Sequence, residues 1–166
     1  MLHICIELKS QLKKCNIFLT QLTSQMETEE IILVKESWKL VAVNPLAAGQ
    51  LFYNRLFQIA PELKPMFRSD MATQSNALTT MIGYVVNKLD KLNEIIGEVE
   101  GLARRHVKYG VKDEHYTTVG EALIWTLKMG LGEHWTDELQ AAWIKCYTIL
   151  SSAMISASRV TEDQVE

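Results

Sequence analysis

Residues 101–111, GLARRHVKYGV, decide the prediction of the fold and of the site. The apolar residues Ile95, Val99 and Leu102 precede His106 at spacings of four and three, which is the period of one face of an α-helix. His106 continues this face four residues after Leu102, so its imidazole is expected to face the core. A histidine in that place is hydrogen-bonded or binds a metal, and the pattern alone leaves both interpretations open.

Every strong periodicity in the rest of the chain is also helical. Helix-start signals recur at Thr28 as an N-cap, at Asn44-Pro45, near Met71 and at Thr136. Pro61 and Pro65 interrupt one helix, and Gly110 is expected to end the helix of His106. No alternating strand pattern and no repeat is present, so the sequence predicts an all-α fold.

The composition restricts the class of protein. The chain has 166 residues, 48% of them hydrophobic and 22% charged, with a formal net charge of -3. Lysine and arginine form no stripe on one helix face, so we expect no nucleic-acid partner. Three cysteines without metal-type spacing favour a reducing compartment, and no apolar run has transmembrane length. We therefore expect a cytoplasmic domain that does not bind membranes.

Between about Thr28 and Ala157 the chain contains a series of short sequence features in a specific order. They are Lys35-Glu36-Ser37-Trp38, Leu51-Phe52-Tyr53, Pro61 and Phe67, Gln74 and Leu78, Arg105-His106, Tyr116-Thr117-Thr118-Val119-Gly120-Glu121-Ala122-Leu123, Ala142-Trp143 and Tyr147. In this order they resemble the globin family, in particular single-domain bacterial globins and neuroglobin-like proteins. The resemblance implies a globin fold, a three-over-three helical sandwich that encloses haem b. It also implies reversible binding of O2, CO and NO.

The same resemblance assigns residues to the two faces of the haem. It implies that His106 is the ligand of the iron, because a neutral histidine nitrogen holds the iron in haem proteins of this kind. The residues expected to contact the cofactor are Phe67, Leu78, Val111, Val119 and Tyr116. Phe67 would stack on the porphyrin.

Tyr53 and Gln74 are the expected distal residues, on the opposite side of the haem from His106. A phenol and an amide there would donate hydrogen bonds to a polar gas ligand. Neuroglobin-like proteins have a histidine where this chain has Gln74, and that histidine can occupy the sixth position of the iron. Because amides are poor iron ligands, we expect a mainly five-coordinate ferrous iron that is open to gases.

Tyr116 matches a tyrosine of flavohaemoglobin-type globins that belongs to a network with a carboxylate near the end of the last helix. Ser158 stands at the corresponding place here, which favours oxygen binding, storage, transport or sensing over oxygen activation. The alternative function is that of a nitric oxide dioxygenase served by a separate reductase. A helical protein without haem is the third hypothesis, and it would require the matching residues to coincide by chance.

The expected organisation has three parts, an N-terminal extension at residues 1–25, a globin domain at 26–158 and a tail at 159–166. The extension carries an amphipathic stripe of Ile4, Leu8, Leu12, Cys15, Leu19 and Leu22. Two interpretations are favoured, an accessory helix docked on the domain or an upstream start that precedes Met26. A dimerisation or membrane-surface helix is the alternative, so a homodimer stays open.

Overall fold

The computed structural model describes residues 26–162, and every regular element in that range is helical. The elements are α2 (Thr28–Val41), α3 (Pro45–Ile59), η1 (Pro61–Met66), α4 (Met71–Asn87), η2 (Leu89–Ile95), α5 (Ile96–Lys108), α6 (Asp113–Leu131), η3 (Gly132–His134) and α7 (Asp137–Glu162), where η marks a 3₁₀ helix. The all-α prediction is therefore confirmed. The predicted extension at residues 1–25 and residues 163–166 lie outside the described residues.

Most of the expected helix ends are present, because polar side chains satisfy the free backbone groups there. The Asn44 side chain accepts from the backbone N–H of Ala47 at 3.2 Å at the start of α3. Gly110 follows α5 with a φ of 78°, a left-handed conformation that glycine adopts without strain. The predicted N-cap at Thr28 is wrong, since Glu27 is the N-cap of α2. The Glu27 backbone N–H donates to the Glu30 carboxylate at 2.7 Å, so Glu27 is the cap and Thr28 is the first helical residue.

The helix of His106 starts later than its apolar period suggests. Ile95 is the last residue of η2, and α5 begins at Ile96. Lys91 has non-helical dihedral angles, with φ of -141° and ψ of 36°, so the backbone bends before α5. Ile95 is nevertheless only 1% exposed, because its side chain points into the core although the residue lies in a 3₁₀ helix and not in α5.

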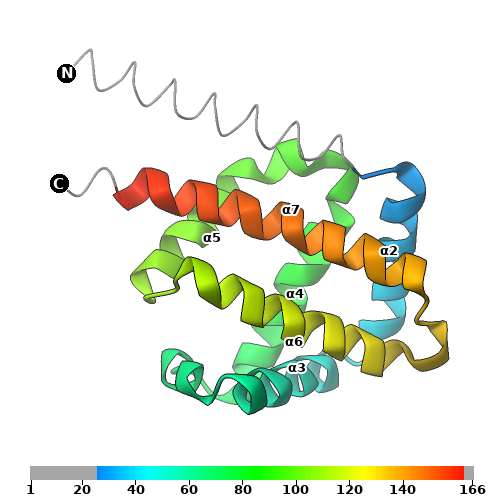
Figure 1. Ribbon diagram of the computed structural model, residues 1–166, viewed down its shortest axis with the longest axis horizontal. Coiled ribbons are helices and arrows are strands. Elements are labelled where there is room, and N and C mark those ends of the chain that lie inside the picture. Colours follow the sequence, from blue (N-terminus) through cyan, green and yellow to red (C-terminus); the bar gives the residue numbers. More distant parts are fainter. Residues whose placement is uncertain (1–25, 163–166) are drawn as a thin grey trace.

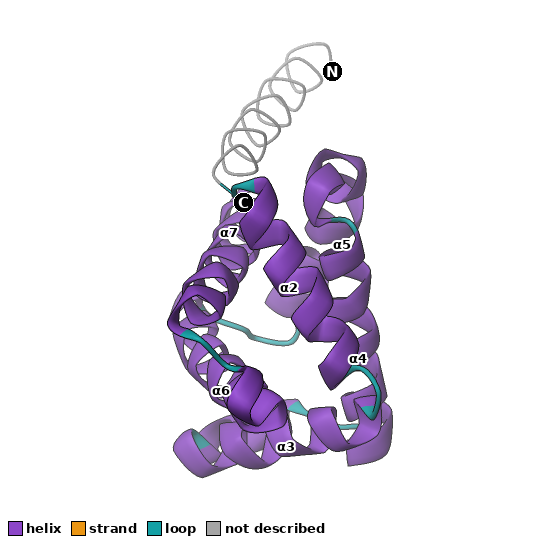
Figure 2. Cartoon of the chain, turned by 90° about the vertical axis from the view of Figure 1, so that its right-hand side faces the viewer, coloured by secondary structure: helices purple, strands orange, loops and turns teal. Residues whose placement is uncertain are grey.

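The helices form two sides around the buried residues. In Figure 2, α6 and α7 lie on one side, α4 and α5 on the other, and α3 closes one end. Figure 1 shows α7 beside α6 along much of its length. The main packing contacts are α3 with α4, α3 with α6, and α5 with α7. The helix of His106 is thus held chiefly by α7.

The core is apolar, with a few paired polar groups. Trp143 of α7 is 2% exposed, and its ring lies 6.1 Å from that of Trp38 of α2, measured between centroids. The Trp143 indole N–H donates to the buried Ser37 hydroxyl at 3.0 Å, so the buried indole is not left without a partner. These contacts join α2 to α7.

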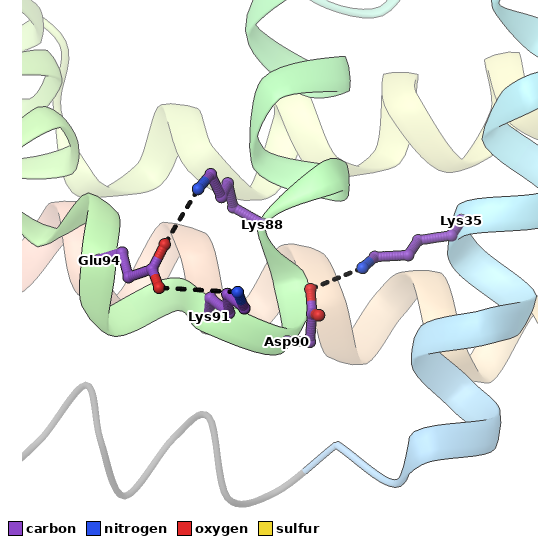
Figure 3. A network of polar contacts seen from close by, with 5 residues as sticks. All are labelled: Lys35, Lys88, Asp90, Lys91 and Glu94. Carbon is purple, nitrogen blue, oxygen red and sulfur yellow. Dashed lines mark hydrogen bonds and ion pairs between the residues drawn. The ribbon is translucent and has the colours of Figure 1, made fainter.

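Ion pairs connect η2, the segment before α5, to α2 and to the end of α4. Lys35 of α2 contacts Asp90 of η2 at 2.6 Å, and Lys88 contacts Glu94 at 3.0 Å (Figure 3). Hydrogen bonding to Lys35 lowers the pKa of Asp90. Exposed pairs of this kind contribute about 1 kcal/mol or less each, so they orient η2 more than they stabilise it.

Candidate cofactor site

His106 lies in the last turn of α5 and is half-buried. Its Nδ1 atom lies 2.9 Å from the backbone carbonyl oxygen of Leu102, one turn earlier. Because a carbonyl only accepts hydrogen bonds, Nδ1 carries the proton in the neutral ring and the lone pair is on Nε2. Within residues 26–162 no group bonds to Nε2. The ring is therefore oriented by its own helix, with one nitrogen available.

The environment of His106 favours the uncharged imidazole. Burial lowers the pKa of His106, the hydrogen bond to Leu102 raises it, and the neighbouring Arg105 guanidinium lowers it, with a net downward shift. A neutral imidazole is the form that ligates a metal. Of the two interpretations from the sequence, the hydrogen-bonded core histidine accounts for Nδ1 only, and Nε2 stays free for a ligand.

Tyr116 of α6 flanks the His106 ring. The two ring centroids are 6.4 Å apart and their planes are inclined by 19°, so the rings lie nearly parallel. Burial, with a contribution from Asp113, raises the pKa of Tyr116 to about 12, which keeps the phenol protonated at neutral pH. The Ser158 hydroxyl donates to the Ile155 carbonyl of its own helix at 2.8 Å. The Ser158 hydroxyl hydrogen is therefore bonded within α7.

Tyr53 of α3 lies in an aromatic cluster near the corner between α3 and α4. Its ring centroid is 5.2 Å from that of Phe67 and 5.7 Å from that of Phe57, and the side chain is 5% exposed. Burial raises the pKa of Tyr53 to about 12. The Tyr53 hydroxyl makes no hydrogen bond within the described residues. The cluster therefore holds a protonated phenol in apolar surroundings.

Gln74 and Leu78 lie on α4, one turn apart, and both are half-buried. The neighbouring Ser75 packs on Gly49 of α3 so closely that a Cβ atom at Gly49 would lie 2.5 Å from the Ser75 Cβ. Tyr53 lies one turn after Gly49 on α3. Gln74 is the residue directly before Ser75 on α4. Both predicted distal residues, Tyr53 and Gln74, therefore lie within one helical turn of the contact between Gly49 and Ser75, where α3 crosses α4.

Several apolar side chains on the elements that carry these polar groups are only partly covered by protein. They lie on η1 and its end, on α4, on α5 and on α6, and they are Met66, Phe67, Leu78, Ile82, Leu102 and Val119. Val111 is also half-buried, and its backbone N–H donates to the His106 carbonyl at 3.0 Å. Apolar surface that the protein itself does not cover suits contact with a flat apolar group.

One contact beside the site has no counterpart in the sequence prediction. The Tyr147 hydroxyl of α7 donates to the backbone carbonyl of Tyr116 at 2.6 Å. Tyr147 was singled out by the sequence only as a feature of the resemblance. The two residues are 31 positions apart and lie on different helices, so no local period could have joined them.

The chain is similar to several known proteins. The Globin family model matches residues 50–154. The flavohemoprotein of Bacillus subtilis (strain 168) is 33% identical over 144 residues, which cover 85% of this chain and 36% of that protein. The neuroglobin of Tetraodon nigroviridis is 26% identical over 144 residues, covering 78% of this chain and 91% of that one.

A solved structure of a bacterial globin from Campylobacter jejuni has the same fold. It superposes with a TM-score of 0.75 at 26% identity, covering 82% of this chain and 99% of that one. This chain spans about a third of the length of the flavohemoproteins that it matches. The fold and the family match agree with the resemblance seen in the sequence. The chain belongs to the globin family, whose cofactor is haem.

Proposed function

We propose that this globin reversibly binds O2, CO and NO at a mainly five-coordinate ferrous haem, for oxygen binding, storage, transport or sensing. The single observation that carries the proposal is His106, a neutral imidazole with Nδ1 held by Leu102 and Nε2 unbonded within the described range. One histidine nitrogen beside half-covered apolar side chains is a donor set that fits haem b. The residues present therefore suit the family's cofactor.

His106 is the proposed iron ligand through Nε2. Its hydrogen bond from Nδ1 to the Leu102 carbonyl selects the tautomer, limits rotation of the ring and makes the imidazole a better electron donor. The bound haem supplies a ferrous centre with an open position for a small gas. Phe67, Leu78, Val111, Val119 and Tyr116 are the proposed cofactor contacts.

Tyr53 and Gln74 are the proposed distal donors. The Tyr53 side chain is 5% exposed and packs against aromatic rings, and a hydrogen bond gains strength where the local dielectric constant is low. A gas ligand that acquires partial negative charge is held by such donors, whereas CO gains less from them. Gln74 offers an amide instead of an imidazole, and because amides are poor iron ligands it would not compete with a gas for the iron.

The test compares His106→Ala with His134→Ala after expression with haem. His134 is exposed in η3 and serves as the matched control. The wild-type and His134→Ala proteins should retain haem with the spectrum of a five-coordinate ferrous histidine complex. His106→Ala should lose haem unless imidazole is added, because the main protein bond to the iron is absent. A histidine-type spectrum in His106→Ala would refute the assignment.

Similarity to flavohemoproteins favours a second candidate, a nitric oxide dioxygenase served by a separate reductase. Ser158, whose hydroxyl bonds within α7, offers no carboxylate that would make the proximal imidazole more basic, which favours the binding role. Repeated NO consumption with a cellular reductant separates the two. We expect one rapid equivalent followed by slow turnover, and sustained turnover would support the enzyme instead.

We further propose residues 26–158 as the globin domain, with 1–25 as an N-terminal extension and 159–166 as a tail. No helix within the described range has the length and hydropathy to cross a bilayer. The proposed location is the cytoplasm, because three cysteines without metal-type spacing favour a reducing compartment. Sedimentation of chains beginning at Met1 and at Met26 would test whether the extension supports a homodimer.

A further inference from the structure

One face of α2 leaves apolar side chains in contact with solvent. Four of the nine large apolar side chains exposed among the described residues lie between residues 32 and 43, and they are Ile32, Leu33, Leu40 and Val43. The other face of α2 is buried, through Val34, Ser37, Trp38 and Val41. A helix that packs on its domain with one face and is apolar on the other is typical of a helix with a second partner.

The exposed face of α2 has the residue spacing of a helix–helix contact. Its exposed positions recur at intervals of four, three and four residues, and they are Glu29, Leu33, Glu36 and Leu40. Residues 1–25, which lie outside the described residues, carry the same spacing in their sequence. Their stripe recurs at intervals of four, three, four and three residues in Leu8, Leu12, Cys15, Leu19 and Leu22. Two helices with this spacing can keep their stripes in contact along their common length.

The backbone before α2 permits the chain to reverse its direction. Glu27 is extended, with φ of -70° and ψ of 153°, and its capping box with Glu30 makes Thr28 the first helical residue. A short non-helical break is what joins the two antiparallel helices of an αα-hairpin. As a helix, residues 4–22 would span about 28 Å and α2 spans about 21 Å, at a rise of about 1.5 Å per residue. The segment is therefore long enough to cover the face.

The charges of the two segments are complementary. Residues 1–25 contain three lysines and one glutamate, whereas α2 and its cap contain four glutamates and two lysines. Glu29 and Glu36 are exposed on the same face as the apolar side chains. A basic helix is attracted to this face, whereas α2 of a second copy would bring like charges together. The charges thus favour the chain's own segment as the occupant.

We propose that residues 4–22 form an amphipathic helix that packs antiparallel on the exposed face of α2. Its leucines would cover Ile32, Leu33, Leu40 and Val43, so the extension would be part of the folded unit that binds the cofactor. Burial of apolar surface on both helices drives the contact. The inference does not rest on the ligand of the iron or on the binding of gases.

The experiment uses the native Cys15 of the stripe as one half of a disulfide in the full-length protein. Each variant carries Cys5→Ser and one added cysteine, either Glu36→Cys or Leu40→Cys on the face of α2. The matched control is Asn54→Cys, at an exposed position of α3. Cys146 is buried and stays in place. A disulfide requires the two Cα atoms to approach to about 4.4–6.8 Å, and two positions one turn apart on α2 cover more than one register.

After mild oxidation, at least one α2 variant should form a disulfide within one chain in most molecules, and the control in few. Mass spectrometry of the digested, unreduced protein identifies the bond. Adding Leu12→Asp, which puts a charge in the stripe, should lower the yield, whereas Ser10→Asp, on the opposite side of the predicted helix, should not. Equal yields in these two variants would show that the leucine stripe does not make the contact.

Three other outcomes would overturn the inference. Disulfides between two chains would show that a second copy covers the face. Equal cross-linking of the α2 variants and the control would show that the segment has no preferred place on the domain. Sedimentation of the wild-type protein with vesicles of phosphatidylglycerol and phosphatidylcholine, lost in Leu12→Asp and kept in Ser10→Asp, would assign the stripe to a lipid surface. None of these results changes the assignment of His106, which the haem content of His106→Ala tests separately.

Discussion

The crossing of α3 and α4 is expected to be sensitive to a single added methyl group at Gly49. In Gly49→Ala the new Cβ would lie 2.5 Å from the Ser75 Cβ, 2.6 Å from its Cα and 2.7 Å from its carbonyl oxygen. Carbon atoms in contact are ordinarily about 3.5–4.0 Å apart, so the overlap is about 1 Å. Two of the three atoms belong to the backbone, and therefore no rotamer change relieves the overlap.

The expected magnitude is the difference between two effects. Alanine is favoured over glycine inside a helix by about 1 kcal/mol, whereas overpacking of this kind costs about 1–3 kcal/mol, occasionally more. Because the helices themselves must move apart, we take the upper value and expect Gly49→Ala to lower the free energy of unfolding by about 2 kcal/mol. Separation of α3 from α4 should also disturb Tyr53 and Gln74, which lie within a turn of the crossing.

Urea denaturation followed by circular dichroism measures the effect. With a slope of about 2 kcal/mol per molar urea, the midpoint of Gly49→Ala should fall by about 1 M. Gly101→Ala is the control, since its Cβ would meet only the ends of two arginine side chains, at 3.7 and 3.8 Å. That variant should gain up to about 1 kcal/mol from helix propensity. If Gly49→Ala is as stable as Gly101→Ala, the close crossing is not a property of the folded protein.

Two further predictions concern ligand release and acid stability. Tyr53→Phe and Gln74→Leu should each speed O2 dissociation in stopped-flow measurements, with each lost hydrogen bond worth about 1–3 kcal/mol, and unchanged rates in both would show that neither side chain reaches the ligand. Glu30→Gln should lower stability at neutral pH by about 1 kcal/mol or less, because hydrogen bonding to Lys145 lowers the pKa of Glu30. This contribution is present above the unfolded pKa and is lost as pH falls through the lower folded pKa, so wild type and variant should converge in acid, and a constant difference in urea titrations would contradict the argument.

The local signals in the sequence were sufficient for most helix boundaries. Asn44 and Gly110 act at helix ends because a short polar side chain or a left-handed backbone satisfies free groups within a few residues. The same logic was wrong at Thr28, where Glu30 reaches back to the Glu27 N–H and moves the cap by one residue. Either Glu27 or Thr28 could have capped the helix, and the hydrogen bond from the Glu27 N–H to the Glu30 side chain decided for Glu27.

The candidate site could be foreseen only in part. The period of α5 and the resemblance to globins singled out His106, and Tyr53 and Gln74 followed from the resemblance. The tautomer of His106 depends on the Leu102 carbonyl, which the helical spacing could have suggested, since a side chain reaches the backbone one turn earlier. Whether His106, Tyr53 and Gln74 bind the cofactor and its ligand is still a prediction.

The sequence by itself determined the helical class, the family and the residue types that suit haem, because these follow from local periods and from the order of a few side chains. Tertiary structure alone decided which helices touch. The approach of Gly49 to Ser75 and the hydrogen bond from Tyr147 to Tyr116 join segments far apart in the chain. Such contacts depend on the packing of whole helices, so Gly49 could not be told from an ordinary helical residue until the fold placed its neighbours.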